Sequence, residues 1–245
     1  MGQLQCFVTI HDQDLLLACE AAGQFDAFSK HTYLFVGPRP VDRIPFDVDV
    51  IVARRFHPNK EKMPQFYDFT GWWTLMHHEL VEADNVVFLQ YDMTVTQPAI
   101  ERRIVNSLSR DPGMVAFTAG YFGPNWMLTV PGFAQTYRAG LATRGVNPDD
   151  FPPFNPWPST QGTAWRTEEF YRYMAWFEPM FDVFAGHVLA GHLAERTVKA
   201  WSVLNHEEHY MPGVIHHQAL DAHGTSALMA GKHKVYQERA GTFGK

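Results

Sequence analysis

The sequence has little cysteine and no long apolar run, and both absences narrow the class of protein. Only two of its 245 residues are cysteines, Cys6 and Cys19, and they do not form a CxxC pair. This pattern excludes a disulfide scaffold and a cysteine-based zinc site, and it indicates a reducing compartment. The first residues lack a signal peptide's charged-then-apolar pattern, and no apolar run approaches the roughly 18 residues of a membrane helix. We therefore predict a soluble cytoplasmic protein with no membrane span, for which at most a peripheral membrane association is expected.

The chain also lacks a large excess of either acidic or basic residues. Charged residues make up 19% of the chain, and 26 acidic against 20 basic residues give a net charge of −6, with both signs mixed along the sequence. Because nothing resembles a basic tract, a nucleic-acid partner is not expected. The sequence also lacks a GxGxxG motif, a Walker loop, a GxSxG motif and a Cys–His pair. A serine or threonine nucleophile is therefore not supported.

The composition that remains is that of a globular α/β protein. Hydrophobic residues reach 46% and aromatic residues 14%, which is enough for a substantial core in a single domain of 245 residues. Short apolar runs alternate with helical stretches in the first half, which predicts a mostly parallel sheet with helices on its faces. The expected strands are 6–10, 33–36, 48–52, 86–89 and 114–118, and the expected helices are 15–25, 69–82 and one that begins near 98.

The second half is rich in aromatic residues and mainly helical. Residues 145–165 contain five prolines and show little periodicity. The aromatic residues beside these prolines favour a loop that covers a substrate over a solvated linker. A helical stripe begins at Glu168, and Pro179 should kink or restart that helix. A further helix is expected from Gly191, and a short strand at 214–215.

The stretch 59–96 contains the first candidate site residue. A helix face there leads into the buried run 86–89, which ends in Gln90, Tyr91 and Asp92. Ligands of open α/β sheets bind outside the carboxyl ends of the strands. A hard cation that also holds phosphates needs one or two protein carboxylates. We therefore interpret Asp92 as a carboxylate at a ligand site, and the alternative is a simple turn residue.

Glu195 is the second candidate, and its sequence context allows two interpretations. Lys199 follows four residues later, which is the favourable spacing for an ion pair on the surface of a helix. Such an exposed pair contributes only about 0.3–0.5 kcal/mol. The pattern alone leaves open whether Glu195 belongs to a surface pair or to a site.

The histidines form the third group, because eight of the 13 follow residue 186. Two local groups resemble metal ligands in composition, His206 with His209 and His216 with His217. Neither group matches a known zinc spacing such as HExxH. His216 and His217 are the better candidates, since they end an expected strand.

Three segments carry a resemblance to a known family. Residues 65–77 (QFYDFTGWWTLMH) are similar to N-x-Y-x-E-L-T-G-x-Y-W-x-W-K-N, residues 170–181 (FYRYMAWFEPMF) to F-x-x-Y-x-x-W-L-F-P-I-L, and residues 191–196 (GHLAER) to G-x-x-x-E-R. In this order they resemble a family of GT-A-fold glycosyltransferases from bacterial capsule and O-antigen clusters. The resemblance implies a GT-A-like (Rossmann-like) α/β fold. It also implies transfer of a sugar, of the hexosyl type, from a nucleotide-sugar donor such as a UDP- or GDP-sugar. The acceptor would be a glycan or a lipid-linked glycan in polysaccharide biosynthesis.

The same resemblance implies roles for individual residues. Asp92 would bind a divalent cation, Mn²⁺ or Mg²⁺, and His216 or His217 would complete that metal site. Gln90 stands where these enzymes carry the first acid of an Asp-x-Asp motif, so it would bind the ribose of the donor. Glu195 would act as the catalytic base at a helix start. The remaining residues expected to bind substrate are His11, Asp12, Arg54, Arg55, Tyr67, Thr70, Gly71, Trp72, Tyr91, Trp165 and Arg196.

The resemblance also divides the chain, while two other functions stay open. Residues 1–120 would bind the nucleotide sugar, residues 121–230 would hold the acceptor and the catalytic residues, and 231–245 would be a tail. A His-rich metal-dependent hydrolase would instead use the late histidines together with Asp221. A non-catalytic carbohydrate-binding protein would use the aromatic residues of 151–165. Retained zinc would favour the hydrolase, and glycan binding without any nucleotide would favour the binding protein.

Overall fold

The computed structural model describes most of the chain. The described residues are 2–37, 41, 44, 47–53, 66–95, 97–110, 113–117, 119–120, 129–152, 157–158, 160–206, 209–211 and 215–217.

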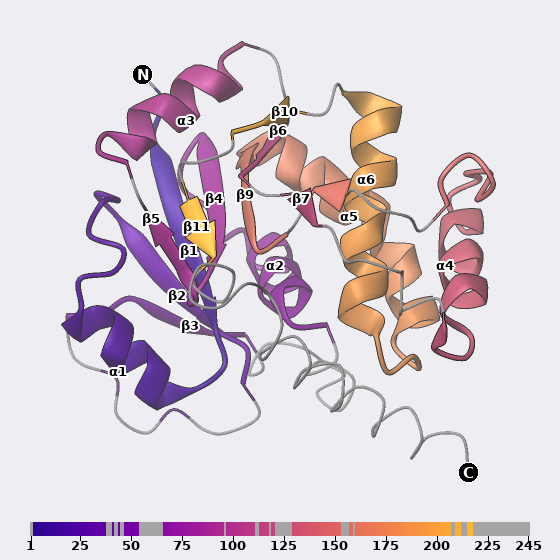
Figure 1. Ribbon diagram of the computed structural model, residues 1–245, viewed down its shortest axis with the longest axis horizontal. Helices are drawn as coiled ribbons and strands as arrows, with labels where there is room; N and C mark the ends of the chain where they lie inside the picture. The colour runs from indigo at the N-terminus through magenta and orange to yellow at the C-terminus, as the bar shows by residue number, and fades with distance from the viewer. Residues whose placement is uncertain are drawn as a thin grey trace.

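Seven strands form the central sheet in the order β10, β6, β9, β4, β1, β2, β3 (Figure 1). Their bounds are β1 Leu4–Ile10, β2 His31–Phe35, β3 Val50–Val52, β4 Asn85–Gln90, β6 Met114–Ala116, β9 Gly162–Arg166 and β10 His209–Tyr210. Neighbouring strands are parallel except at β9, which runs antiparallel to both β4 and β6. The predicted α/β class with a mostly parallel sheet is confirmed.

Two short antiparallel ladders lie outside this sheet. Strand β5 (Met93–Val95) pairs with β11 (Ile215–His217), and β7 (Ala119–Gly120) pairs with β8 (Trp157–Pro158). Because β5 follows β4 after two residues, the first ladder brings a late part of the chain to the end of a central strand.

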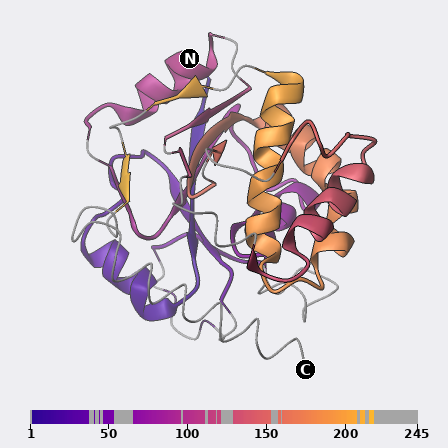
Figure 2. The ribbon, with the colours of Figure 1, turned by 45° about the vertical axis from the view of Figure 1, so that its right-hand side comes forward.

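The helices cover the sheet on both faces. Their bounds are α1 Gln13–Ala21, α2 Asp68–His77, α3 Ile100–Leu108, α4 Phe133–Ala142, α5 Thr167–Phe184 and α6 Ala190–Asn205. Helices α1 and α3 lie on one face, and α2, α4, α5 and α6 lie on the other, as the turned view of Figure 2 shows. The predicted helices of the second half therefore form most of one layer.

The central strands are apolar along their whole length because both of their faces are buried. In β4, Val86 and Phe88 belong to the core under α2 and α5, whereas Val87 and Leu89 belong to the core under α1 and α3. Burial on both faces explains why the sequence shows a continuous apolar run here and no alternation.

The strand β9 corrects the expectation of an irregular loop over 145–165. Its residues Gly162–Arg166 pair with two strands that lie far away in sequence, and its first four residues are buried. A five-residue strand buried on both faces has no alternating pattern, and the prolines before it hid it from sequence reading. Both β9 and β10 come from the second half of the chain and lie in the same sheet as the strands of the first half.

Two helices also differ from the expectation. Helix α2 ends at His77 and not at 82, since Glu79 has a positive φ of 49° and Leu80 N donates to Leu75 O at 3.0 Å. Helix α5 continues through Pro179, which was expected to kink or restart it. Its buried aromatic face, which includes Phe177, outweighs the one backbone hydrogen bond that proline removes.

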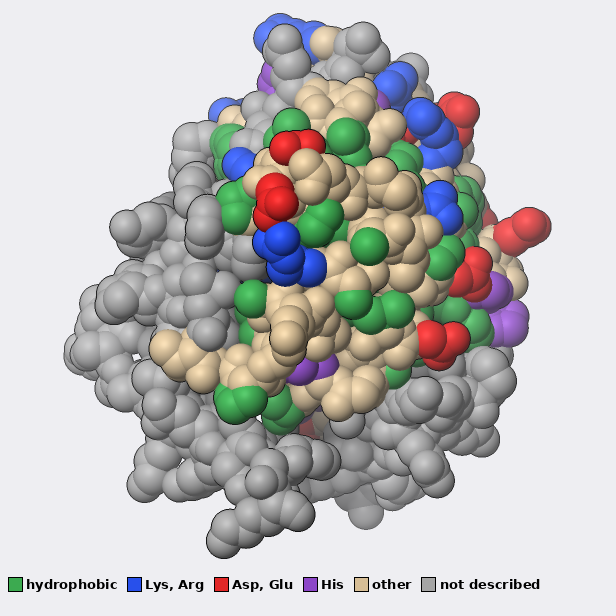
Figure 3. All heavy atoms as spheres, turned by 90° about the vertical axis from the view of Figure 1, so that its right-hand side faces the viewer, with side chains coloured by type: hydrophobic (Ala, Val, Ile, Leu, Met, Phe, Trp, Pro, Cys, Tyr) green, Lys and Arg blue, Asp and Glu red, His purple; other side chains and the backbone are tan. Residues whose placement is uncertain are grey.

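The surface over the helical layer carries charges of both signs. Figure 3 shows acidic and basic side chains interspersed on this face, with hydrophobic side chains scattered among them. Arg138 and Asp149, which are both exposed, form an ion pair at 2.6 Å. Within the described ranges, none of the helices combines the length and the apolar character that a bilayer crossing requires.

Candidate functional site

The order of the strands reverses between β1 and β4, and these two strands end side by side. Thr9 pairs with Gln90 in the parallel register, and Tyr91 N donates to Thr9 O at 3.1 Å. Beyond the strand ends, the rings of His11 and Tyr91 meet edge to face with centroids 5.1 Å apart. Open α/β sheets bind ligands outside the carboxyl ends of their strands at such a reversal. This edge is therefore the candidate site, and we refer to it as the carboxyl edge.

Asp12, also expected to bind substrate, has a local structural role at this edge. Its Oδ1 accepts a hydrogen bond from Asp14 N at 2.8 Å, and it is the N-cap residue of α1. A capping side chain of this kind satisfies one of the first backbone donors of a helix. Asp12 thus determines where α1 begins, right after β1.

Asp92 lies in the two-residue turn between β4 and β5. Gln24 holds both sides of this turn, because its Nε2 donates to Tyr91 O at 2.6 Å and to Met93 O at 2.7 Å. Asp92 is only 9% exposed. It is thus a turn residue, and at the same time a largely buried carboxylate at the end of a central strand.

Asp68, the first residue of α2, reaches the same edge from another element. Gln90 Nε2 donates to Asp68 Oδ2 at 2.6 Å, and Asp68 is 5% exposed. Burial raises the pKa of Asp68 to about 7, although hydrogen bonds from Gln90 and Thr9 favour its ionised form. A carboxylate that is buried with neutral partners is destabilised relative to its protonated form.

Asp68 was absent from the residues predicted to form the site. A signal for it was present, since the segment E-L-T-G of the family pattern is matched by Asp68 and the three residues after it. The neighbouring residues of that segment were predicted to bind substrate instead.

Glu195 occupies a buried polar position on α6. The helix begins at Ala190, so Glu195 lies in its second turn and not at its start. It is 8% exposed, which rules out an exposed ion pair on the protein surface. Its Oε1 accepts from Thr160 Oγ1 at 3.3 Å, and its Oε2 lies 3.5 Å from His192 Nδ1 and 3.5 Å from Arg196 Nη1.

Arg196 is the cation beside this carboxylate. It is 1% exposed, and burial lowers the pKa of Arg196 to about 10, an effect that the neighbouring Glu195 carboxylate partly offsets. The Glu195 carboxylate is the nearby negative charge that a buried guanidinium requires.

Two acids from other elements act on Asp68 through their charge. The charges of Glu195 and Asp92 both raise the pKa of Asp68, in addition to the larger effect of burial. Asp92 lies 24 positions after Asp68 in the sequence, and Glu195 lies 103 positions after Asp92. A strongly perturbed carboxyl group beside a strand-order reversal, as Asp68 is, is typical of functional sites.

The backbone also brings the two predicted metal-binding histidines to this region. His217 pairs with Met93, the residue after Asp92, and His216 pairs with Thr94. A carboxylate such as Asp92 fits a hard cation that takes its other ligands from phosphate and water. Among side chains that the structure describes, which do not include those of these two histidines, no three metal-binding groups converge.

Four of the residues expected to bind substrate lie in the core. Trp72 and Trp165 have no exposed surface and pack edge to face with centroids 6.1 Å apart. Gly71 is the contact point of α2 with β2, where a Cβ would lie 2.9 Å from Leu34 Cδ1. Thr70 is likewise buried. These residues hold α2 against the sheet, and we assign them packing and not substrate contact.

Tyr67 precedes this packed helix and has a strained backbone. It is half-buried, and its φ of 48° and ψ of −114° lie in a region that side-chain-bearing residues rarely adopt. Such strain costs about 1–3 kcal/mol and is common beside functional sites.

The residues of the alternative metal hydrolase do not gather in one place. His206 Nε2 contacts Glu169 Oε1 at 2.5 Å at the end of α6. His209 lies in the central sheet, whereas His216 lies in the separate β5–β11 ladder. Asp221, like Arg54 and Arg55, lies outside the described residues.

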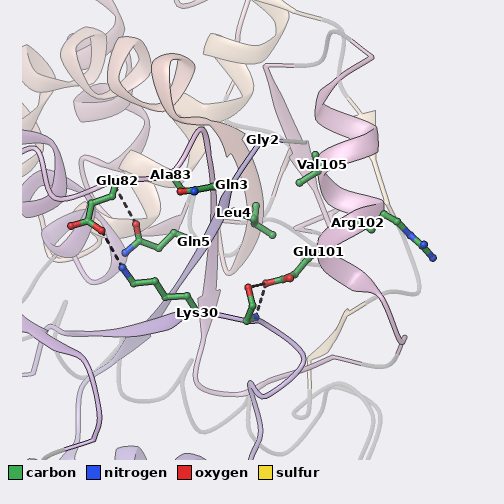
Figure 4. Close-up of a pocket in the computed structure, with 11 residues that line it drawn as sticks. Gly2, Gln3, Leu4, Gln5, Lys30, Glu82, Ala83, Glu101, Arg102 and Val105 are labelled. Atoms are coloured by element: carbon green, nitrogen blue, oxygen red, sulfur yellow. Dashed lines mark hydrogen bonds and ion pairs between the residues drawn. The ribbon is translucent and has the colours of Figure 1, made fainter.

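A concavity of about 520 Å³ lies at the opposite, amino edge of the sheet (Figure 4). Its lining residues are Gly2, Gln3, Leu4, Gln5, Ser29, Lys30, Glu82, Ala83, Glu101, Arg102 and Val105. Its acids already have partners: Lys30 Nζ lies 3.1 Å from Glu82 Oε2, and the backbone N–H of Ser29 donates to Glu101 Oε1 at 2.6 Å. Arg102 points away from it in Figure 4. We therefore assign no ligand to this cavity.

Comparisons with known proteins agree with this arrangement at the level of the fold. No family model matches the sequence, and no curated protein matches it. Among solved structures, the bifunctional glycosyltransferase WbbM is 14% identical, with a TM-score of 0.56 over 87% of this chain. The chain shares its fold with WbbM. It spans 45% of the length of that chain.

Two further structures match with lower scores. The galactosyltransferase LgtC, solved with donor and acceptor sugar analogues, is 14% identical over 97% of this chain and 95% of its own, with a TM-score of 0.45. The mannosyltransferase Ktr4p from S. cerevisiae is 13% identical over 80% of this chain and 62% of its own, with a TM-score of 0.38. Both TM-scores are below 0.5, so we base no conclusion on these two structures.

Proposed function

We propose that this protein is a glycosyltransferase that binds a nucleotide sugar at its carboxyl edge. The observation that carries the proposal is Asp68, a buried carboxyl that holds Gln90 at the strand-order reversal of a WbbM-like fold and whose pKa the charges of Glu195 and Asp92 raise. Asp68 and Asp92, both largely buried, create a negative potential there. Such a potential stabilises a divalent cation or the positive charge that develops on a sugar ring during transfer.

The donor is a UDP- or GDP-sugar, with its nucleotide at the ends of β1 and β4. The ring of Tyr91, which His11 meets at 5.1 Å, offers a flat surface on which a base can stack. Gln90 would hydrogen-bond the ribose, and Arg54 and Arg55 would contact the phosphates or the base.

Asp92, with His216 or His217, would hold a divalent cation, Mn²⁺ or Mg²⁺. When bound there, the cation supplies positive charge against the diphosphate that leaves the sugar. Gln24 keeps the turn that carries Asp92 in place through two backbone carbonyls.

Glu195 would remove the proton from the acceptor hydroxyl in an inverting transfer. Arg196, at 3.5 Å, favours the ionised carboxylate that such a base requires, and Thr160 donates to its other oxygen. The acceptor would be a glycan or lipid-linked glycan, as in polysaccharide biosynthesis, and the transferred group a hexose.

A ligand screen tests the proposal directly. The melting temperature of the purified protein is measured with UDP-, GDP-, CMP- and dTDP-sugars, each with and without Mn²⁺. A donor that binds only the native state raises the melting temperature as its concentration exceeds its dissociation constant. We expect a rise with a UDP- or GDP-sugar that grows with Mn²⁺, and the same rise in the control variant Asp149→Ala. If no nucleotide sugar stabilises the protein, the proposal is wrong.

A further inference from the structure

Gln90 and Asp68 form a hydrogen-bonded pair that links a strand end to a helix start. Gln90 is the last residue of β4 and is partly exposed, whereas Asp68 lies 22 residues earlier and is buried. Gln90 Nε2 donates to Asp68 Oδ2 at 2.6 Å. The partly exposed member of this pair is thus anchored by the buried one.

Asp68 is the fixed member of the pair. Its helix packs tightly, with Gly71 against Leu34 and with Trp72 fully buried. Thr74 in the same helix donates to Thr70 O at 2.9 Å. Glutamine, in contrast, has three rotatable side-chain bonds, and an exposed end of such a side chain samples several rotamers unless a partner holds it.

The chemistry of the pair determines which group Gln90 presents. An ionised carboxylate only accepts hydrogen bonds, and a side-chain amide both donates and accepts. With its NH₂ group directed to Asp68, the amide of Gln90 keeps its carbonyl oxygen for another partner. The edge of the sheet thereby gains an oriented hydrogen-bond acceptor.

We propose that Asp68 is a positioning residue that fixes Gln90 as a hydrogen-bond acceptor for a ribose hydroxyl of the donor. This inference rests on the proposed function, because it requires a nucleotide at the carboxyl edge. It specifies that the site distinguishes ribonucleotides from their deoxy forms. Gln90 makes the contact, and Asp68 orients Gln90 without touching the ligand. A ribose hydroxyl donates to the amide oxygen, and a deoxy analogue leaves that oxygen without the bond.

The test is a set of dissociation constants for defined nucleotides. Isothermal titration calorimetry with Mn²⁺ present compares UDP with 2′-deoxy-UDP and 3′-deoxy-UDP, and GDP with its two deoxy forms. In the wild type, we expect one of the deoxy forms to bind about tenfold more weakly, the loss typical of one hydrogen bond. In Asp68→Ala, the ribonucleotide should weaken to the level of its deoxy form, which erases the preference.

Two further variants separate positioning from charge and from folding. Asp68→Asn keeps a side-chain oxygen that accepts from Gln90 Nε2, so it should retain most of the preference. Gln90→Met removes the acceptor at a partly exposed strand end, so it should lose the preference even if Asp68→Ala does not fold. The exposed acid Asp182 provides the matched control Asp182→Ala, which should behave as wild type.

The outcomes are distinct. If Asp68→Ala or Gln90→Met keeps the wild-type preference, the positioning role is wrong while the proposed function stands. If Asp68→Asn loses as much as Asp68→Ala, the negative charge matters and not the acceptor, and the positioning role is again wrong. If wild type binds neither UDP nor GDP, the proposed function fails, and this inference fails with it.

Discussion

Two buried carboxylates, Asp68 and Glu169, lie at the first turns of neighbouring helices but in opposite surroundings. Glu169 is 3% exposed and accepts from Trp201 Nε1 at 3.0 Å, His206 Nε2 at 2.5 Å and Arg172 Nη1 at 2.7 Å. Asp68 accepts from the neutral side chains of Gln90 and Thr9, and two other acids raise its pKa. Glu169 is compensated by its partners, whereas Asp68 is held in an unfavourable environment.

The difference separates a structural carboxylate from one at a candidate site. Glu169 joins the start of α5 to the end of α6, and Gly113 leaves room for it, since a Cβ there would lie 2.6 Å from Glu169 Cγ. A satisfied network of this kind stabilises a fold. Unfavourable charge at Asp68 is instead typical of a site that binds a cation or develops charge during a reaction.

The largest expected effect is on catalysis at the carboxyl edge. Replacing the proposed base, Glu195→Gln, should lower kcat/KM for sugar transfer by on the order of a thousandfold, because the acceptor hydroxyl loses its proton acceptor. Nucleotide affinity and the far-ultraviolet circular dichroism spectrum should stay unchanged. The exposed acid Glu168 gives the matched control Glu168→Gln. Turnover of Glu195→Gln at the wild-type rate would remove Glu195 from the mechanism.

The Asp92→Ala variant tests whether the cation binds at Asp92 on the carboxyl edge. Transfer should be abolished while the melting temperature without ligand changes little. The gain in melting temperature that Mn²⁺ adds to the nucleotide sugar should disappear as well. A variant that still responds to Mn²⁺ as wild type does would show that the cation binds elsewhere.

Next comes the pH dependence of stability at Asp68. Its pKa in the folded protein, about 7, exceeds the unfolded value of 3.8. The protonated Asp68 carboxyl therefore favours the folded state. This contribution is fully present below pH 4 and is lost as the pH rises through 7 and Asp68 ionises. Asp68→Asn, which cannot ionise, should gain stability relative to wild type by up to about 4 kcal/mol between pH 4 and 7. Urea unfolding at several pH values measures this, with Asp26→Asn as the exposed control, and parallel curves would contradict it.

Glu169 should behave in the opposite way. Glu169→Ala leaves the donors of the buried Trp201 and the partly buried His206 without their acceptor and should lower the free energy of unfolding by roughly 3 kcal/mol. Transfer per folded molecule should not change. The neighbouring Glu168→Ala should cost far less, since Glu168 is exposed. A loss of transfer activity in Glu169→Ala without a loss of stability would remove the distinction between the two carboxylates.

The smallest effect is expected away from both carboxylates. Ala99 has a φ of 56° and a ψ of 33°, a left-handed conformation before α3. Ala99→Gly should raise the free energy of unfolding by about 0.5–1 kcal/mol, because glycine adopts this conformation without strain. Transfer activity should stay at the wild-type level, and destabilisation in urea would contradict the strain argument.

The elements with strong local signals could be predicted from the sequence. Strands β1 and β4 show as apolar runs, and the position of Asp92 follows from the end of β4. Strand β9 could not be predicted, because its identity depends on pairing with β4 and β6 and not on its own pattern. Local periodicity does not contain such long-range information.

The candidate site was predictable only in part for the same reason. The sequence predicts that Trp72 and Trp165 bind a ligand, yet aromatic side chains also suit a core, and both are fully buried in the structure. The sequence does not predict Asp68 as a site residue, because its hydrogen bond with Gln90 and the charges that raise its pKa come from other elements. In both cases the role of the residue depends on which side chains surround it in the folded protein.

Hydrogen–deuterium exchange with a bound nucleotide compares the two edges of the sheet most directly. The protein is labelled with and without a saturating UDP- or GDP-sugar and Mn²⁺, and exchange is read for peptides that cover residues 9–12 and 90–95 and for peptides that cover 2–5 and 80–84. We expect slower exchange at the first pair, around the carboxyl edge, and no change at the second pair, around the amino-edge cavity. Protection confined to residues 2–5 and 80–84 would contradict the assignment of the donor site.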